Sequence, residues 1–307
     1  MKGYFYILLA VIAWGFEYLF IKAGTDRVSP FVSGAYLFGT ATILLFLFSL
    51  SHKDLMKSIL RNLYILILIG VIGTGCNMFF IFGVKNTSIS NSAILGRADI
   101  VFTLLLSSLL FREKIKKSNI IIIAIMLAGV FLTVCTDLNT FRFGNRGDYF
   151  ILTAALLISI NAFFIKKCMK NVGGVIIALV NAFINTLCFI GSVIFFESSK
   201  AFTAVSNETL LTLIAAGICC CMFFIGYYGG LKKLPVWVVR LLCLGVPLVA
   251  ICANWIWYNK TPTLWQAGGG ILILGGATGI VLSSVKNAGK NNLIRDKLCG
   301  IINNRQK

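Results

Sequence analysis

The amino-acid sequence predicts an all-α membrane protein with ten transmembrane helices arranged as two inverted five-helix repeats. Three observations predict this fold class: an apolar composition, a series of long apolar runs, and short motifs that recur at one spacing. Hydrophobic residues make up 58% of the 307 residues, charged residues make up 12%, and the mean hydropathy is +0.91. A soluble domain carries about 25% charged residues, so a soluble fold could not hide this much apolar surface.

Each predicted helix corresponds to one apolar run, since about 20 apolar residues suffice to cross a bilayer. The first run is longer than the apolar part of a signal peptide and no small-residue cleavage site follows it, so we expect a retained span. Short polar loops separate the runs. The ten runs lie at residues 3–23, 31–50, 62–84, 89–111, 119–136, 148–166, 174–196, 208–230, 236–258 and 264–285.

The repeat is visible in two short motifs, FIK and CxMFFI, each of which occurs twice at an offset of 144 residues. Five spans fit into each copy, and an odd number of spans turns the second copy upside down in the membrane. We therefore expect a first repeat over residues 1–145, a second over 146–286, and a cytoplasmic tail over 287–307. Inverted repeats are typical of secondary transporters, whose binding site lies between the halves.

Lys and Arg are distributed unevenly between alternate loops. Of the 28, nineteen fall in the segments on the side of the N-terminus, seven fall in the opposite loops, and Arg97 and Arg240 fall inside spans. Cytoplasmic loops carry the excess of Lys and Arg, which predicts a multi-pass protein of the plasma membrane with both termini in the cytoplasm. The net charge of +18 does not indicate a nucleic-acid partner, because the basic residues form short bursts between apolar runs.

The sequence predicts no enzyme, no metal site and no cofactor. Most of the ten cysteines lie inside apolar runs, no CxxC pair occurs, and the single histidine, His52, lies in a loop. We interpret the cysteines as small apolar packing residues. The glycine-rich stretches do not lie between a strand and a helix, as a phosphate-binding loop would require.

Arg97 and Asp99 are two charges inside an apolar run, AILGRADIVFTLLL. Ionisable residues within a membrane span are costly and usually face a polar cavity or a partner. On a regular helix, residues i and i+2 point in directions about 200° apart. The side chains of Arg97 and Asp99 therefore cannot pair with each other on a regular helix. Either they point to different neighbours or the helix is irregular near Gly96. The alternative to a functional site is an ion pair with other helices that fixes their packing.

Further candidates for solute binding or coupling are polar or aromatic residues in other spans. Glu17 and Asn161 are related by the offset of 144 residues, and Glu17 is a candidate for binding an amine, accepting a proton or neutralising Arg97. Arg240 lies near the inner end of its span, where reaching back to the interface is the simpler explanation and contact with an anionic solute is the other. The remaining candidates are Trp14, Asn77 and Asn181.

These features together resemble the drug/metabolite transporter superfamily, of the EamA type. The residues that carry the resemblance are AVIAWGFEYLFIKAG in the first span, NTSISNSAILGRADIVFTLLLSSLLFREKI in the fourth, and LKKLPVWVVRLLCLGVPLVAICANWIWYNKTP in the ninth. Glu113 resembles the family's Glu at the inner end of the fourth span. The chain departs from the family in the second span, where SGAYLFG lacks an Arg, and near Thr261, where no acid matches Glu113.

The resemblance implies ten helices in two inverted halves that move small metabolites, such as amino acids, by alternating access. Export and exchange are both open, and proton coupling through Glu17 or Asp99 competes with uncoupled transport. A lipid-linked sugar flippase or its partner subunit would share the fold. A membrane-embedded enzyme acting on a lipid is a further alternative, although the loops lack the acidic cluster that such an enzyme needs. The expected partners are a small-molecule solute and the lipid bilayer.

Overall fold

A computed structural model describes residues 2–50, 55–86, 95–111, 117–134, 144–198, 200–258, 261 and 263–279, and all regular structure within these ranges is helical. Its elements are α1 (Lys2–Thr25), α2 (Pro30–Ser49), α3 (Leu55–Arg61), α4 (Leu63–Asn86), α6 (Ala98–Phe111), α7 (Lys117–Val134), α8 (Arg146–Cys168), α9 (Gly174–Phe196), α10 (Lys200–Thr203), α11 (Asn207–Lys233), α12 (Val236–Leu242), the 3₁₀ turn η2 (Cys243–Gly245) and α13 (Val246–Tyr258). Residues 264–279 form a last helical segment.

The long helices follow the predicted apolar runs closely. Within the described residues, six helices are long and apolar enough to cross a membrane, and three shorter apolar helices accompany them. The predicted span 174–196 coincides with α9, and the predicted span 208–230 lies within α11. Residues 89–94, 135–136 and 280–285 of three predicted spans, Glu113, and the predicted tail 287–307 lie outside the described residues.

Two of the predicted spans are interrupted in the structure, and for the fourth an irregular helix near Gly96 was one of the two alternatives that the sequence left open. The ninth, 236–258, is divided into α12 and α13 by η2. Pro247 explains this break, because it has no N–H to donate to the carbonyl of Cys243. In the fourth, a turn at Arg97 precedes α6, so the helix is irregular next to Gly96. Arg97 and Asp99 therefore do not lie on one regular helix.

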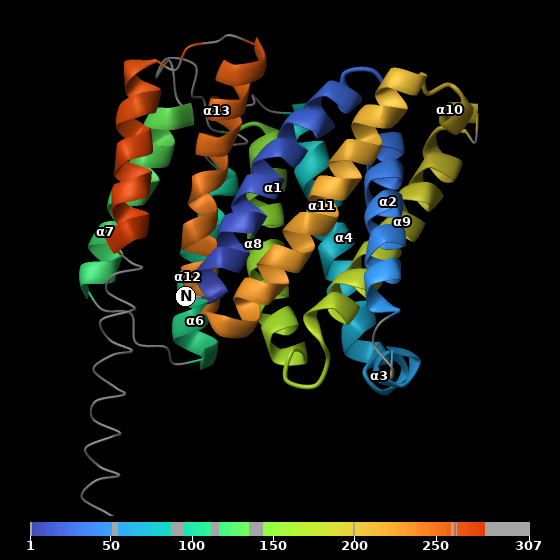
Figure 1. Cartoon of the computed structure of the whole chain (residues 1–307), viewed down its shortest axis with the longest axis horizontal. Coiled ribbons are helices and arrows are strands. Elements are labelled where there is room, and N and C mark those ends of the chain that lie inside the picture. The colour runs from blue at the N-terminus through green and yellow to red at the C-terminus, as the bar shows by residue number, and fades with distance from the viewer. Residues whose placement is uncertain are drawn as a thin grey trace, which may run out of the picture.

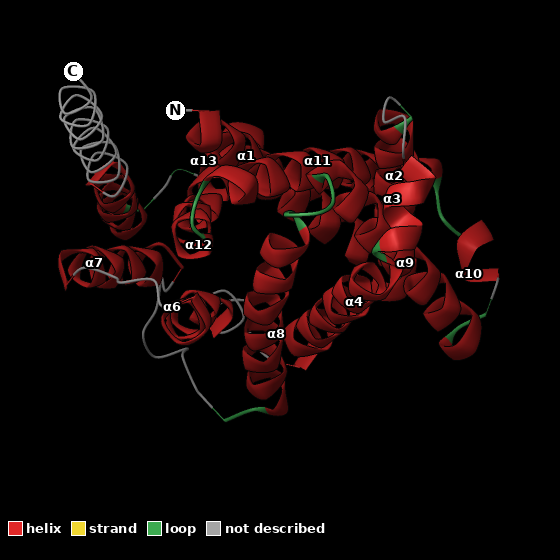
Figure 2. Cartoon of the chain, turned by 90° about the horizontal axis from the view of Figure 1, so that it is seen from below, coloured by secondary structure: helices red, strands yellow, loops and turns green. Residues whose placement is uncertain are grey.

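The helices run roughly parallel to one axis, with α3 at one end of the bundle and α10 at the other (Figure 1). Seen along the helices, α1 packs beside α11 on one side, and α8 packs beside α4 on the other (Figure 2). Helices α2 and α9 pack against each other at one end of the long dimension, and α7 lies at the opposite end. Large apolar side chains such as Phe46, Phe195 and Leu105 are exposed on the outside, as expected for a surface that contacts lipid.

The three longest matching helix pairs begin at the same spacing. In each of these three pairs, the second helix starts 144 residues after the first, which is the offset of the sequence motifs. The pairs of first residues are Lys2 and Arg146, Pro30 and Gly174, and Leu63 and Asn207.

Close approach of α1 and α11 depends on Gly226. A Cβ atom at this position would lie 2.6 Å from the Tyr6 carbonyl oxygen and 2.8 Å from the Ala10 backbone nitrogen. These are backbone atoms, so a larger residue could be admitted only by moving a helix. Small residues that allow such approach are characteristic of helix contacts in membranes.

Gly226→Val should lower the melting temperature of the purified protein in detergent, because overpacking of this kind costs about 1–3 kcal/mol. Gly191→Val is the matched control, since a Cβ atom on Gly191 of α9 would meet nothing within 4 Å. Thermal unfolding followed by size-exclusion chromatography measures both. Equal melting temperatures for the two variants would contradict the close packing of α1 against α11.

Candidate functional site

An ion pair between Arg240 and Asp99 lies inside the helix bundle. Arg240 comes from α12, directly before η2, and Asp99 lies in the first turn of α6, directly after the turn at Arg97. The Arg240 Nη1 and Asp99 Oδ2 atoms are 3.5 Å apart, and the two side chains are 3% and 7% exposed. The prediction that Arg240 reaches back to the membrane interface is therefore wrong, because a buried carboxylate is available to it nearby.

Arg240 is held by two further groups from other helices. Its Nη2 donates to the carbonyl oxygen of Ile158 in α8 at 3.1 Å, and its guanidinium carbon lies 4.9 Å from the centre of the Tyr227 ring in α11. A guanidinium over an aromatic face is stabilised by the negative face of the ring. Three helices therefore position the side chain from α12.

Several buried polar atoms around this pair have no hydrogen-bond partner among the described residues. A buried polar group without a partner is unusual, since about 90% or more are satisfied in folded proteins. Their concentration around one guanidinium marks this place as the strongest candidate site. They are Arg240 Nε, Arg240 Nη1, Asp99 Oδ1 and the Tyr227 hydroxyl.

Arg97 points to a different neighbour from Asp99, as the sequence analysis allowed. Its guanidinium carbon lies 5.7 Å from the centre of the Trp14 ring in α1. Trp14 contacts Phe223, with ring centres 4.9 Å apart, and Phe223 stacks on Tyr227 at 5.3 Å. Three aromatic rings therefore connect the surroundings of Arg97 with those of Arg240.

Glu17 is buried in α1, at 6% exposure, and its Oε2 has no hydrogen-bond partner among the described residues. Its carboxyl group lies beside the Cys220 thiol of α11. Glu17 makes no ion pair with Arg97, so the interpretation that it neutralises this arginine is wrong. The two residues meet different partners because Arg97 is directed onto Trp14.

Asn161, the counterpart of Glu17, lies in a separate group of polar side chains between α4, α8 and α9. Asn77 donates to Asn185 at 2.8 Å, and Asn185 lies within hydrogen-bond distance of Asn181. Asn181 in turn donates to the Tyr228 hydroxyl at 2.9 Å. The predicted residues Asn77 and Asn181 are thus in one network.

The same network contains Asn185 and Tyr228, which the sequence analysis did not select. Asn185 follows Asn181 by four residues, so both lie on one face of α9, and this spacing was the available signal. Gly73 allows the network to form, because a Cβ atom there would lie 2.5 Å from Asn181 Oδ1 and 3.3 Å from Asn161 Nδ2.

Helix α8 joins the charged pair to the asparagine network. The Ser159 hydroxyl lies 2.8 Å from the Asp99 carbonyl oxygen, next to the Ile158 carbonyl that binds Arg240. Asn161, two residues further along, faces Gly73 and has a buried Oδ1 without a partner among the described residues. One turn of α8 therefore contacts both polar groups, which brings together Asp99, Arg240, Asn161 and Asn181.

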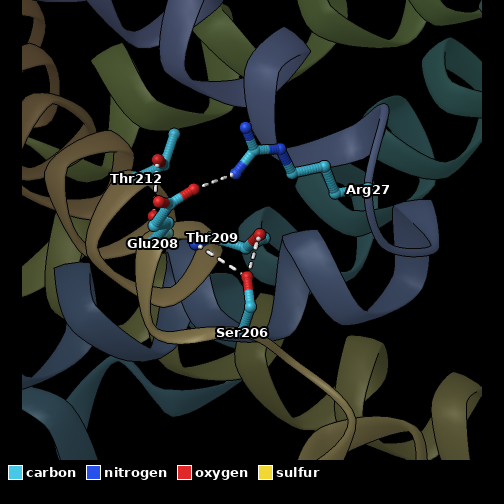
Figure 3. Close-up of polar contacts among 5 residues, drawn as sticks. All are labelled: Arg27, Ser206, Glu208, Thr209 and Thr212. Atoms are coloured by element: carbon cyan, nitrogen blue, oxygen red, sulfur yellow. Dashed lines mark hydrogen bonds and ion pairs between the residues drawn. The ribbon is translucent and has the colours of Figure 1, made fainter.

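A third polar group lies outside the core, at the end of the bundle that carries α10. Arg27, in the turn after α1, donates to Glu208 in the first turn of α11 at 2.9 Å, and both side chains are more than half exposed (Figure 3). Ser206 caps α11 by accepting from the Thr209 backbone N–H at 3.4 Å. Nearby, Ser29 donates to Glu197 at 2.7 Å.

The described residues contain no group of three or more His, Cys, Asp or Glu side chains that could hold a metal ion. The cysteines that the structure describes are free thiols, and several are buried in the helix bundle. Their positions fit a packing role. The candidate site itself is built from charged, hydroxyl and amide groups.

Known proteins with similar sequences are transporters. The sequence model of the EamA-like transporter family matches residues 1–135 and again residues 145–282. A probable amino-acid metabolite efflux pump of Salmonella typhimurium is 25% identical over 284 residues, which cover 90% of this chain and 93% of that protein. An uncharacterized transporter of Synechocystis is 27% identical over 213 residues, which cover 66% of this chain but only 61% of that protein.

A solved crystal structure shares the fold, with a TM-score of 0.78 at 18% sequence identity, over 92% of this chain and 98% of the other. The two family matches together span nearly the whole chain, and the helices described above are long and apolar enough for a bilayer. The chain is therefore a multi-pass membrane protein, a transporter and not an enzyme, and it belongs to the EamA-like transporter family.

Proposed function

We propose that the protein is a secondary carrier that exports or exchanges small metabolites such as amino acids by alternating access. The observation that carries this proposal is the buried Arg240–Asp99 pair, with unpartnered polar atoms around it. Ionisable residues in membrane spans mark solute or ion pathways by default. The name of the Salmonella relative, a probable amino-acid metabolite efflux pump, supports the choice of solute class and of export.

Alternating access in this proposal arises from two inverted halves, residues 1–145 and 146–286. The common offset of 144 residues between helix starts supports it, as do the two family matches, which begin 144 residues apart at residues 1 and 145. In Figure 1, α2 runs towards α3 at one end of the bundle, whereas its counterpart α9 runs towards α10 at the other. Opposite directions of matched helices are what an inverted repeat requires.

Two contacts between counterpart residues support a pseudo-two-fold axis. The Thr42 and Thr186 hydroxyls lie 3.0 Å apart and are 144 residues apart in the chain. Gly129 of α7 lies against Ile273, which is again its counterpart at the same offset. A residue that touches its own counterpart must lie near the symmetry axis. We infer an axis along the long dimension of the bundle, from the α2–α9 contact to the α7 contact with residues 264–279.

This symmetry distinguishes two kinds of contact between the halves. If the halves exchange conformations during transport, the two residues of a contact on the axis only exchange roles. Such a contact is therefore present both before and after the change. The Arg27–Glu208 ion pair is of the other kind, because its counterpart residues are Asn171 and Tyr64, which cannot form an ion pair. We infer that Arg27 and Glu208 favour the conformation in which this end of the bundle is closed. By the distribution of Lys and Arg, this end faces the outside and both termini face the cytoplasm.

We expect Asp99→Asn to leave membrane insertion intact and to reduce solute transport at least tenfold, because the site loses one of its charges. The measurement is efflux of a mixture of amino acids from proteoliposomes, with and without a proton gradient. Acceleration of wild-type efflux by the gradient would support proton coupling, and equal rates would support a facilitator or exchanger. Efflux at the wild-type rate by Asp99→Asn would assign Asp99 to packing. If no solute moves through the wild type under any gradient, the carrier function is refuted.

A double-mutant cycle separates the packing role of the ion pair from its transport role. Arg240→Met should lower stability by about 3–5 kcal/mol, since it leaves a buried carboxylate without its partner. Asp99→Asn combined with Arg240→Met should recover most of this loss, because neither charge remains. Transport should stay low in the double variant. Full recovery of both melting temperature and transport would show that the pair serves packing alone.

Arg27→Glu should change the transport rate by no more than about fivefold, because an exposed ion pair contributes about 0.2–1 kcal/mol. The reversed pair, Arg27→Glu with Glu208→Arg, should return the rate towards the wild-type value. Lys57→Glu, an exposed charge reversal on α3 at the other end of the bundle, is the control. Proteoliposome transport rates measure all three variants, and a large loss that the reversed pair does not repair would contradict the closing role.

A further inference from the structure

Arg240 has more hydrogen-bond donors than its surroundings use. A guanidinium carries five N–H groups, and the described residues provide one hydrogen-bond acceptor, the Ile158 carbonyl oxygen. Nε and Nη1 are buried without a hydrogen bond, although Nη1 faces Asp99. On the other side of the pair, Asp99 Oδ1 is also buried without a partner.

The ion pair itself is loose. Charge-assisted hydrogen bonds between nitrogen and a carboxylate are about 2.7–2.9 Å long, whereas Arg240 Nη1 and Asp99 Oδ2 are 3.5 Å apart. A buried pair is stable only when its geometry is good and further hydrogen bonds satisfy the remaining atoms. Both partners therefore have unused capacity for binding a charged group.

The unused hydrogen-bonding capacity is on a positive group at Arg240 and on a negative group at Asp99. Arg240 can donate to a carboxylate, for which the guanidinium is well suited, and the unpartnered Tyr227 hydroxyl lies on a residue that contacts Arg240. Asp99 can accept from an ammonium group. A solute carrying only a carboxylate would take Arg240 and leave Asp99 as a buried charge without a partner, which is strongly unfavourable. A zwitterion satisfies both residues and adds no net charge.

We propose that a small zwitterionic solute inserts between Arg240 and Asp99, with its carboxylate on Arg240 and its ammonium group on Asp99. Resting on the carrier function above, this assigns the solute class and names the two residues that recognise it. The direct Arg240–Asp99 contact is then the form of the empty site, in which each residue substitutes for one half of the solute. Replacing one loose pair by two pairs keeps every buried charge compensated throughout binding.

Reciprocal chemical rescue tests this assignment on the full-length purified protein. Asp99→Ala leaves Arg240 without an anion. Acetate should therefore raise the melting temperature of this variant by about 3 °C or more, compared with chloride at equal ionic strength. Acetamide, which has the same shape but no charge, should not. Arg240→Ala leaves Asp99 without a cation, so methylammonium should stabilise it while acetate does not. The double variant, Asp99→Ala with Arg240→Ala, is the matched control and should respond to neither ion.

Equal responses of all three variants to both ions would overturn the assignment, because they would reflect a general effect of salt. For variants that do not stay folded in chloride, the yield of monodisperse protein purified in acetate or methylammonium provides the same comparison. Asp99→Asn and Arg240→Met, which conserve volume, should show smaller rescues than the alanine variants because they leave less room. Rescue as large as in the alanine variants would place the ion elsewhere and contradict the assignment.

Transport separates this inference from the function on which it rests. In wild-type proteoliposomes, amino acids should move and their amides and N-acetyl derivatives should move at least tenfold more slowly. If amino acids move but the ions rescue without discrimination, the carrier function stands and the assignment to Arg240 and Asp99 is wrong. If the reciprocal rescue occurs but no amino acid moves, the two residues bind ions and the proposed solute class is wrong.

Discussion

The removal of one positive and one negative charge from water is the constraint on which the rest of this structure depends. Arg240 and Asp99 are almost completely buried, and either charge alone would be strongly destabilising inside an apolar bundle. Both residues lie next to helix interruptions, Asp99 after the turn at Arg97 and Arg240 before η2. Irregular backbone is tolerated within a membrane protein where it lies inside the protein, and here it lies next to the two charges.

Three pairs of long helices repeat at one spacing along the chain, whereas most polar side chains do not. In three helix pairs the first residues lie 144 residues apart, and Thr42 and Thr186 contact each other. The polar side chains, however, have few polar counterparts: at the same offset Asp99 corresponds to Cys243, Arg240 to Gly96, and Asn181 to Leu37. In the proposed mechanism, similar backbones would let the two halves move in similar ways, while a solute with two different ends would require side chains that differ. Among the predicted site residues, only Glu17 and Asn161 keep a polar group at both positions.

The sequence predicted the helices well and the contacts among polar residues poorly. Long apolar runs depend only on local composition, so α9 matches its predicted span and α11 extends its span by a few residues. The breaks at Arg97 and η2 were predicted only in part. The helices packed around a proline or a charge determine how strongly that residue disrupts its own helix. Arg240 was expected to reach the interface, since on an isolated helix a long basic side chain places its charge in water by extending to the membrane surface.

By itself, the sequence determined that this chain is a helical membrane protein, that short motifs recur in it at one offset, that its charges are few, and which residues carry them. Those properties follow from composition and spacing along the chain. Tertiary structure alone decided which of the charges meet: Arg240 with Asp99, Arg97 with Trp14, and Glu17 with Cys220. The physical reason is that buried charges are stabilised by groups from other helices, and the packing that brings those helices together involves the whole fold.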